Sequence, residues 1–333
     1  MNKAPHIPVM LADVLEVLQP KDGGLYVDGT FGAGGYTRAI LGHADCAVLA
    51  IDRDPNAILR GRELETEFGG RLTLIEGRFG DMARLVRELG HESVDGVVLD
   101  LGVSSMQLDQ AERGFSFQKD GPLDMRMSGT GLSAADVVNT FDEPDLARII
   151  AVYGEEKRAR AVAKAIVQAR GEAQFERTLP LADTVARVIG RRPQDRIHPA
   201  TRTFQALRIF VNDELGELAH GLSDAEMLLG EGGRLAAVTF HSLEDRVVKR
   251  FLTARTGRSA RANRFMPEKS EIAPSFDEIE HKARKASEEE ADANPRARSA
   301  KLRAAVRTSA PALPLDLAAL GIARMPSQAE MGA

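Results

Sequence analysis

The stretch that decides the fold of this chain is Leu25-Tyr-Val-Asp-Gly-Thr-Phe-Gly-Ala-Gly-Gly35. A short apolar strand runs into Asp28, and four glycines follow within seven positions. Glycines lack the Cβ atoms that would block a tight turn and keep a ligand away from the backbone. A helical pattern follows from Thr37 to Leu41. The sequence therefore predicts a strand, a ligand-binding loop and a helix in succession.

A second apolar run, from Cys46 to Ile51, ends on Asp52. A carboxylate at this position could bind both ribose hydroxyls of a nucleoside-type ligand. The glycines after Asp28 do not have the G-x-G-x-x-G spacing that places a pyrophosphate at a helix N-terminus. An acid at the head of the loop suits a ligand with an ammonium group, such as the methionine part of S-adenosylmethionine. A turn that only packs a helix against a sheet is the alternative interpretation.

Short apolar segments rich in Val, Ile and Leu alternate with segments long enough to form crossover helices. This alternation predicts an α/β fold with a parallel, doubly wound sheet that is covered on both faces. Ligands of such sheets bind beyond the carboxyl ends of the strands. The strands expected at 25–27, 47–51, 72–75 and 94–99 would bring together Asp28, Asp52, the turn at Phe79, and Asp100.

From about Ser133 to Leu222 the pattern changes to helical periods and helix caps without a β-rich run. Ser133 and Thr178 are expected N-caps, and the segment Asp142-Glu-Pro-Asp145 predicts a helix start. A strand pattern resumes at 232–240, and 301–307 could supply a final edge strand. We therefore predict a discontinuous main domain (1–110 and 223–309), an inserted helical domain (111–222) and a loosely ordered tail (310–333).

The composition is that of a soluble globular protein, with 43% hydrophobic and 28% charged residues. No apolar run approaches the roughly 20 residues that span a bilayer, and we see no secretion signal, so we expect no membrane partner and a cytoplasmic protein. One cysteine, Cys46, and seven scattered histidines give no metal-site spacing, so no metal is expected. Because the net charge is −5, nucleic-acid contact would have to come from local clusters.

Two further stretches begin at predicted strand ends. Asp100-Leu-Gly-Val-Ser-Ser-Met-Gln107 would border a transferable group, although Asp100 and the serines could instead satisfy backbone amides. The second, Phe240-His-Ser-Leu-Glu-Asp-Arg246, enters a helix, for which Ser242 is the expected N-cap with Asp245 three residues on. His241 is a candidate pocket residue.

A basic segment lies between Arg187 and Arg208, where six arginines are opposed only by Asp195. Arginine forks match phosphate oxygens, and His198 is a further donor nearby. A solvated helix face, paired with the acids of 213–217, is the alternative interpretation. The phosphate-contact candidates are Arg191, Arg192, Arg196, His198 and Arg202.

Seven long motifs, in order along the chain, resemble those of the MraW-type methyltransferases. These are bacterial enzymes that use S-adenosylmethionine to methylate cytosine N4 in 16S rRNA. The similarity extends from about His6 to Thr308. The motifs are Asp28–Gly35, Ala50–Pro55, Leu99–Ser105, Asp109–Phe117, Gly121–Arg126, His198–Gln205 and Phe240–Arg246.

The resemblance implies a class I (Rossmann-like) methyltransferase fold with an inserted helical domain, and S-adenosylmethionine as methyl donor. One departure is visible, because the family commonly has histidine where this chain has Tyr36. A tyrosine can still donate a hydrogen bond and stack, so we expect cofactor binding to survive, but a role that needs an imidazole is not carried over to this position. The cofactor contacts implied by position are Gly34, Gly35, Tyr36, Asp52, Phe79, Asp100 and Gln107.

The implied reaction transfers a methyl group to the exocyclic N4 amine of a cytidine in the decoding region of 16S rRNA in the small ribosomal subunit. This amine is a poor nucleophile because its lone pair is delocalised into the ring, so the enzyme must align it with the S–CH₃ bond and exclude water. We hypothesise that Asp100 and the Ser104–Ser105 turn frame the amine and that His241 helps to hold the base. Aromatic residues such as Phe115 would stack on the base after it is unstacked from its neighbours. The insert would contact RNA through the arginines and His198 named above.

Three other functions are considered. A methyltransferase for DNA or small molecules is disfavoured because Asp100-Leu-Gly-Val replaces an Asp/Ser-Pro-Pro-Tyr-like motif. A nicotinamide-dependent oxidoreductase is disfavoured by the glycine spacing, and a ribosome-binding assembly factor with a degenerate pocket stays open. The modest acidity indicates that recognition relies on local patches and on the shape of an assembled particle. A monomer and a homodimer are both compatible with the sequence.

Overall fold

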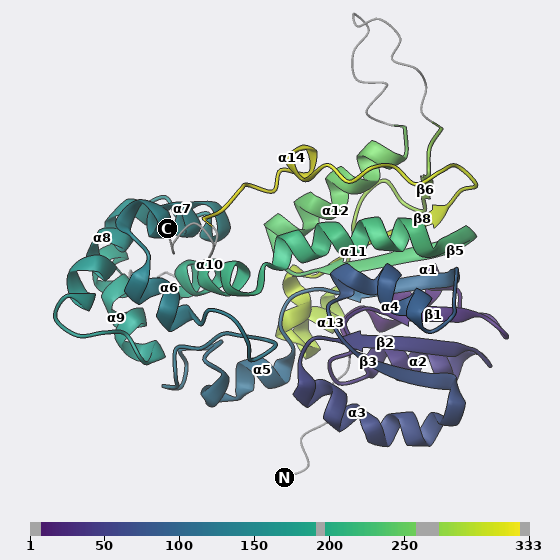
Figure 1. Cartoon of the computed structure of the whole chain (residues 1–333), viewed down its shortest axis with the longest axis horizontal. Coiled ribbons are helices and arrows are strands. Elements are labelled where there is room, and N and C mark those ends of the chain that lie inside the picture. The colour runs from purple at the N-terminus through teal and green to yellow at the C-terminus, as the bar shows by residue number, and fades with distance from the viewer. Residues whose placement is uncertain (1–7, 191–196, 258–272, 327–333) are drawn as a thin grey trace, which may run out of the picture. The chain divides into compact units, whose positions relative to one another are not determined.

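The computed structural model describes residues 8–190, 197–257 and 273–326 (Figure 1). The described residues form two compact units, 8–102 with 215–322, and 103–214 with 323–326. We call them the first and the second unit. The domain limits expected from the sequence, at 110/111 and 222/223, stay a prediction.

The first unit is built on one sheet with the strand order β3-β2-β1-β4-β5-β8-β6, and β7 also pairs with β8. The first five strands along the chain are parallel, whereas β8 is antiparallel to β5 and to the two short strands beside it. The doubly wound α/β sheet predicted from the sequence is thus confirmed. The strands are β1 (Leu25–Asp28), β2 (Ala47–Asp52), β3 (Leu72–Glu76), β4 (Val94–Asp100), β5 (Leu229–Thr239), β6 (Phe276–Glu278), β7 (Arg284–Lys285) and β8 (Lys301–Arg307).

The expectation that 301–307 forms an edge strand is wrong. β8 pairs with β5 on one side and with β6 and β7 on the other, so it lies inside the sheet. β6 and β7 have three and two residues, too few to give a periodic signal in the sequence.

Helices cover both faces of this sheet (Figure 1). On one face, α1, α2 and α3 close a core in which Tyr36, Ile40 and Val48 are buried together with Val98 and Val238. The helices of the first unit are α1 (Leu11–Leu18), α2 (Gly35–His43), α3 (Pro55–Phe68), α4 (Met82–Glu88), α11 (Glu214–Leu228), α12 (Ser242–Arg255), α13 (Glu288–Ala293) and α14 (Leu317–Leu320).

The second unit is helical, as expected. The Ser133 hydroxyl caps the helix that follows it by accepting from the N–H of Asp136, and Asp142 caps the next one. Thr178 is not an N-cap, because it is already helical and its hydroxyl accepts from the N–H of Gly121 at 3.1 Å. The helices are α5 (Ser105–Asp109), α6 (Ala134–Thr140), α7 (Glu143–Gly154), α8 (Ala159–Arg170), α9 (Thr178–Ile189) and α10 (Thr201–Asn212).

The segment expected to be a loosely ordered tail carries α14 and is held by the first unit as far as residue 322. Leu320 is buried and its carbonyl accepts from Arg250 at 3.0 Å, while the N–H of Leu313 donates to the buried Glu226 at 3.1 Å. These backbone bonds order a segment that has no helical or strand period of its own. Residues 327–333 lie outside the described part of the chain.

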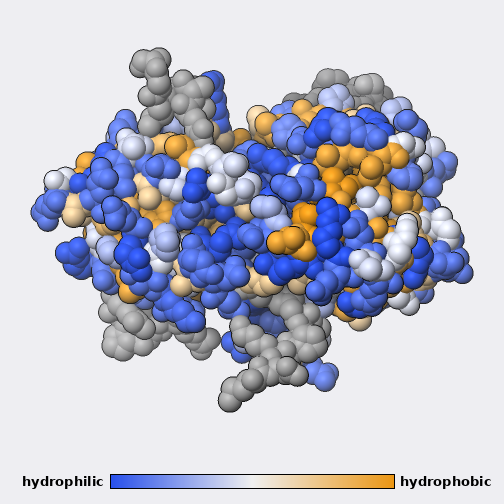
Figure 2. Space-filling view, turned by 60° about the horizontal axis from the view of Figure 1, so that its bottom comes forward, coloured by the Kyte–Doolittle hydropathy of each residue, from blue (hydrophilic) through white to orange (hydrophobic). Residues whose placement is uncertain are grey.

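The face in Figure 2 mixes hydrophilic residues with smaller hydrophobic areas. Large exposed apolar side chains include Leu59, Leu89 and Met227. Among the helices that the structure describes, none is both long and apolar enough to cross a membrane.

Candidate active site

Asp28 ends β1 and fastens the glycine loop at two points. Its Oδ1 accepts from the N–H of Thr30 at 3.1 Å, and its Oδ2 accepts from the Thr37 hydroxyl at 2.7 Å. The carboxyl group is fully buried, and this burial raises its pKa to about 6 because the surrounding protein solvates the anion poorly. Asp28 therefore connects the start of the loop to α2. With a pKa of about 6, its carboxyl group changes its protonation state just below neutral pH.

The glycines of this loop let other parts of the chain approach closely. Gly32 and Gly34 have φ values of +55° and +75°, which favour glycine. A Cβ on Gly34 would lie 2.7 Å from Leu64, and one on Gly35 would lie 2.2 Å from Cγ of Pro8. No larger side chain would fit at Gly34 beside Leu64 or at Gly35 beside Pro8. The roles of these glycines in ligand binding stay a prediction.

Tyr36 is a core residue, with 3% of its surface exposed. Its hydroxyl donates to the carbonyl of Val9, and burial raises the pKa of this phenol well above its usual value. The N–H of Met10 in turn donates to Glu290 at 2.6 Å. The side chain of Tyr36 thus fastens the N-terminal segment, so a cofactor contact from this residue would come from its backbone.

Asp52 ends β2, and its carboxylate accepts from two backbone groups. Oδ2 accepts from the N–H of Gly32 at 2.7 Å, and Oδ1 accepts from the N–H of Asp54 at 2.8 Å. Burial raises its pKa. Each oxygen keeps further acceptor capacity, so the group can still bind ribose hydroxyls. Phe79 lies against the head of the loop, since a Cβ on Gly29 would be 3.1 Å from its Cβ.

Asp100 ends β4 and holds a carboxylate oxygen that the protein does not satisfy. Its Oδ1 is buried and has no hydrogen-bond partner among the described residues. Burial, followed by the nearby Asp28 and Glu244 carboxylates, raises its pKa well above the usual value. An isolated buried acceptor is unfavourable, so this oxygen suits a donor or a cation supplied by a ligand.

His241 and Glu244 form the cap of α12, and here the sequence prediction was wrong by one residue. The N-cap is His241 rather than Ser242, because Nδ1 of His241 accepts from the N–H of Glu244 at 3.4 Å. Glu244 returns a bond by accepting from the N–H of His241 at 3.2 Å, and its Oε1 lies 2.9 Å from Nε2 of His241. An imidazole nitrogen can thus replace the usual hydroxyl acceptor, and the acid three residues later was the available signal.

Ser104 and Gln107 belong to the second unit, where they cap α5 reciprocally. The Ser104 hydroxyl accepts from the N–H of Gln107 at 3.2 Å, and Oε1 of Gln107 accepts from the N–H of Ser104 at 3.0 Å. The expected stacking residue, Phe115, is 6% exposed, and the Arg113 guanidinium lies 5.7 Å from its ring centroid. Its ring is therefore a packing group and is not exposed for stacking on a base.

Of the expected phosphate contacts, His198 and Arg202 are described. Arg202 has 55% of its side chain exposed and donates to the carbonyl of Glu155 at 3.3 Å. Arg208 instead makes a two-point ion pair with Glu214 at 2.7 and 2.8 Å, so the salt-bridge interpretation is correct for this arginine. The remaining candidates, Arg191, Arg192 and Arg196, lie outside the described residues.

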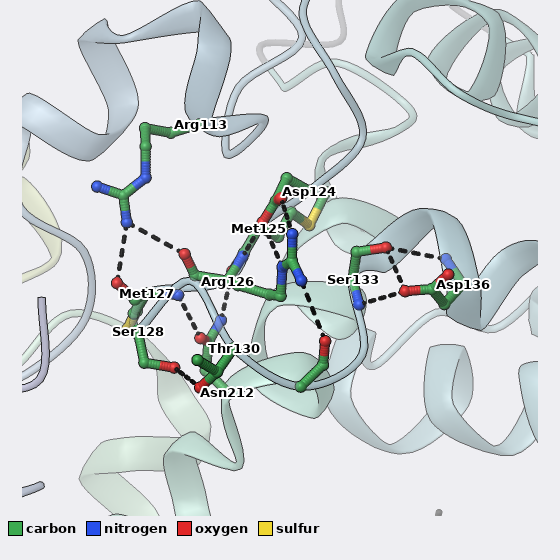
Figure 3. A network of polar contacts seen from close by, with 11 residues as sticks. Arg113, Asp124, Met125, Arg126, Met127, Ser128, Thr130, Ser133, Asp136 and Asn212 are labelled. Carbon is green, nitrogen blue, oxygen red and sulfur yellow. Dashed lines mark hydrogen bonds and ion pairs between the residues drawn. The ribbon is translucent and has the colours of Figure 1, made fainter.

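A network in the second unit holds the segment from 113 to 136 (Figure 3). Asn212 donates to the carbonyl of Met125 at 2.7 Å and accepts from the N–H of Met127 at 2.9 Å. Arg113 donates to the carbonyls of Arg126 and Met127. Met125 has a φ of +64°, which few residues other than glycine adopt. No local pattern in the sequence points to Asn212, because its partners lie about 85 residues away.

The sheet order, the antiparallel β8 beside β5, and the carboxylates at the ends of β1, β2 and β4 define a class I methyltransferase fold. The chain belongs to the MraW methylase family, whose model matches residues 3–308.

Two relatives that align with nearly the whole chain have the same name. The ribosomal RNA small subunit methyltransferase H of Parvibaculum lavamentivorans is 82% identical, over 98% of this chain and 96% of its own length. The protein of that name from Paramagnetospirillum magneticum is 61% identical, over 94% and 98%. A solved rRNA methylase from Streptococcus thermophilus covers 93% of this chain and 99% of its own at 13% identity and a TM-score of 0.37, too distant to support a conclusion.

Proposed function

We propose that this chain is an S-adenosylmethionine-dependent methyltransferase that modifies the exocyclic N4 amine of a cytidine in the decoding region of 16S rRNA in the small ribosomal subunit. Membership of the MraW methylase family supports methyl transfer. The names of the relatives support small-subunit rRNA as the substrate. The resemblance of the motifs supports the cytosine N4 position.

One observation carries the proposal: the unsatisfied Oδ1 of Asp100 at the carboxyl end of β4. Asp28 and Glu244 are both close enough to raise the pKa of Asp100. S-adenosylmethionine carries an ammonium and a sulfonium group, and a bound cation would favour the ionised form of these acids. The buried acids therefore fit this methyl donor.

We assign the methionine end of the cofactor to the loop of Gly34 and Gly35, its ribose to Asp52, and its flank to Phe79. The two oxygens of Asp52 each accept one backbone bond, which fixes the carboxylate before a ligand arrives. Gln107 is kept as a proposed contact from the second unit. When bound, the cofactor supplies an electrophilic methyl group.

On the substrate side, we assign to Oδ1 of Asp100 the role of accepting an N–H of the cytosine amine. This bond would orient the nitrogen lone pair, and the same carboxylate would take the proton that N4 loses as its bond to carbon forms. We keep Ser104 and His241 as proposed residues that position the cytosine amine and the base. Their side chains cap α5 and α12, so the start of each helix holds them in place. His198, Arg202 and the arginines of 191–196 are the proposed RNA contacts.

The experiment incubates the protein with labelled S-adenosylmethionine and undermethylated small subunits, and then maps the modified nucleotide. Label on one cytidine N4 in the decoding region is expected. Naked 16S rRNA at matched salt tests the preference for the assembled particle. Label elsewhere, or binding to the particle without methyl transfer, would refute the assignment, and the second result would favour an assembly factor.

Asp100 is tested with saturating cofactor. Asp100→Asn keeps the size of the side chain but cannot accept a proton, so turnover should fall at least about a hundredfold, the usual scale for a positioned acid or base. Asp45→Asn is a control, since Asp45 is 84% exposed. Full turnover of Asp100→Asn would refute the role given to this carboxylate.

A further inference from the structure

We propose that Phe117 and His198 form a stacking site on the second unit that binds an unpaired nucleobase of the RNA substrate. This inference rests on the proposed function, because it assumes that the substrate is RNA. It assigns base stacking to Phe117 in place of Phe115, the residue expected from the sequence.

The first support is the geometry of three aromatic rings. The Phe117 ring centroid lies 4.8 Å from that of His198, with 43° between the ring planes, and 4.6 Å from that of Phe204, edge to face. Phe204 is buried, whereas Phe117 and His198 are both partly exposed. Phe117 and His198 therefore form an aromatic surface on an apolar base, and each nucleobase has a π-face that can stack on such a surface.

The second support is the rigidity of the segment that carries Phe117. A Cβ on Gly114, whose φ is +71°, would lie 2.2 Å from the carbonyl oxygen of Pro122. A Cβ on Gly121 would lie 1.8 Å from the carbonyl oxygen of Ala111. The segment thus packs tightly against itself on both sides of Phe117. A ring held in this way loses little conformational freedom when a base binds.

The third support is the polar surroundings of the two rings. Lys119 is exposed two residues after Phe117, and the exposed Arg202 lies in the first turn of α10, which begins three residues after His198. Nδ1 of His198 accepts from the N–H of Ala200 at 3.2 Å, so in the neutral ring the proton is on Nε2. The segments that carry the two rings thus also carry two exposed cations, and Arg202 already contacts the Glu155 carbonyl and lies 3.9 Å from Glu156. Cationic and aromatic side chains occur together in proteins that bind single strands.

The direct test uses Phe117→Trp. The chain contains no tryptophan, so the new indole is the only one and reports its own surroundings by fluorescence. We expect a single-stranded RNA of the decoding-region sequence to quench the emission, and the same strand paired with its complement to quench it far less. Leu59→Trp is the control, because Leu59 is 72% exposed in the first unit. Equal quenching by the duplex, or in the control, would overturn the proposal.

A kinetic test separates stacking from packing. Phe117→Leu keeps an apolar cover over Phe204 but removes the π-face. The KM for small subunits should rise about tenfold, the scale of one stacked base, with unchanged kcat and unchanged KM for the cofactor. Phe117→Tyr should restore the KM. An unchanged KM in Phe117→Leu would refute the site.

The fluorescence test also separates this proposal from the proposed function. Quenching of Phe117→Trp needs no methyl transfer. If wild-type protein fails to methylate small subunits while single-stranded RNA quenches the indole, the reaction is wrong and the stacking site stands. If methylation occurs without quenching, the reaction stands and the stacking site is wrong.

Discussion

The backbone N–H of Asp100 donates a hydrogen bond to the hydroxyl of Thr30 at 2.6 Å. The N–H of Thr30 in turn donates to Oδ1 of Asp28. One threonine of the glycine loop thus connects the acid at the end of β1 with the acid at the end of β4. Because β1 and β4 pair directly, the two carboxylates of the site are set by the same local structure.

Thr30→Val tests this connection. The substitution keeps the shape of the side chain but leaves the N–H of Asp100 without its partner, which should cost about 1–3 kcal/mol in the free energy of unfolding. Turnover should fall more than cofactor affinity, because the position of Asp100 changes. Chemical denaturation and methyl-transfer kinetics measure the two effects. Thr66→Val is the control, since this exposed hydroxyl bonds only within α3. Equal effects of the two substitutions would contradict the connection.

Asp28→Asn tests the buried ionisation. The pKa of Asp28 rises from 3.8 to about 6 on folding, so between these values the folded state keeps a proton that the unfolded state has lost. The wild-type protein without cofactor should therefore lose stability as the pH rises through this window, by about 3 kcal/mol at 1.36 kcal/mol per unit. Asp28→Asn should remove this slope and be more stable at neutral pH. Urea unfolding of both proteins between pH 3.8 and about 6 measures the pH dependence of their stability. If Asp28→Asn keeps the pH dependence of the wild type, the pKa shift does not belong to Asp28.

Cofactor affinity should show the opposite dependence on pH. A bound cation favours the ionised forms of Asp28 and Asp100, so binding should weaken as the pH falls through about 6. Calorimetric titration with S-adenosylmethionine measures this trend. Asp28→Asn should bind more weakly at neutral pH and show a smaller pH dependence. An affinity independent of pH in the wild type would show that the acids do not face the cationic groups.

Gly35→Ala tests the cover of the loop. The new Cβ would lie 2.2 Å from Pro8, so either the N-terminal segment or the loop must move. We expect a loss of about 1–3 kcal/mol in stability and weaker cofactor binding. Gly42→Ala in the same helix is a matched control, since a Cβ there meets nothing within 4 Å and alanine favours helix. Equal changes in the melting temperatures of the two variants would contradict close packing of Pro8 on Gly35.

Asn212→Leu tests the network of Figure 3. The substitution removes the partners of the Met125 carbonyl and the Met127 N–H, each worth about 1–3 kcal/mol when left buried. Because the network holds the segment from 113 to 136, which contains none of the proposed cofactor contacts, the KM for small subunits should rise while the dissociation constant of the cofactor stays constant. An altered cofactor affinity would contradict this separation. Asn212→Asp keeps the acceptor for the Met127 N–H but loses the donor to the Met125 carbonyl. Its KM for small subunits should lie between those of the wild type and Asn212→Leu.

The sequence predicted the long strands and the acids that end them, because an apolar run followed by Asp28, Asp52 or Asp100 is a local pattern. It failed where partners are distant. The strand 301–307 could not be recognised as internal, since β6 and β7 are too short to show a period. The unsatisfied oxygen of Asp100 is likewise a consequence of burial, which no spacing reveals.

The caps show a subtler limit. Ser242 is a better N-cap than histidine by residue preference, yet Glu244 lies three residues after His241, and this spacing determines the reciprocal bonds. The aromatic motif shows the same limit, since Phe115 is buried and Phe117 is partly exposed although they are only two residues apart. Residue type alone could not distinguish the inward ring from the outward one.

The N-terminal segment also constrains the order in which the molecule can mature during synthesis. Pro8 packs on Gly35 and Val9 is held by Tyr36, both available early in translation. The bond from Met10 to Glu290 joins residues 280 positions apart, so it forms only when most of the chain has been made. A nascent chain that ends before residue 290 therefore lacks one of the bonds that secure the N-terminal segment beside the glycine loop.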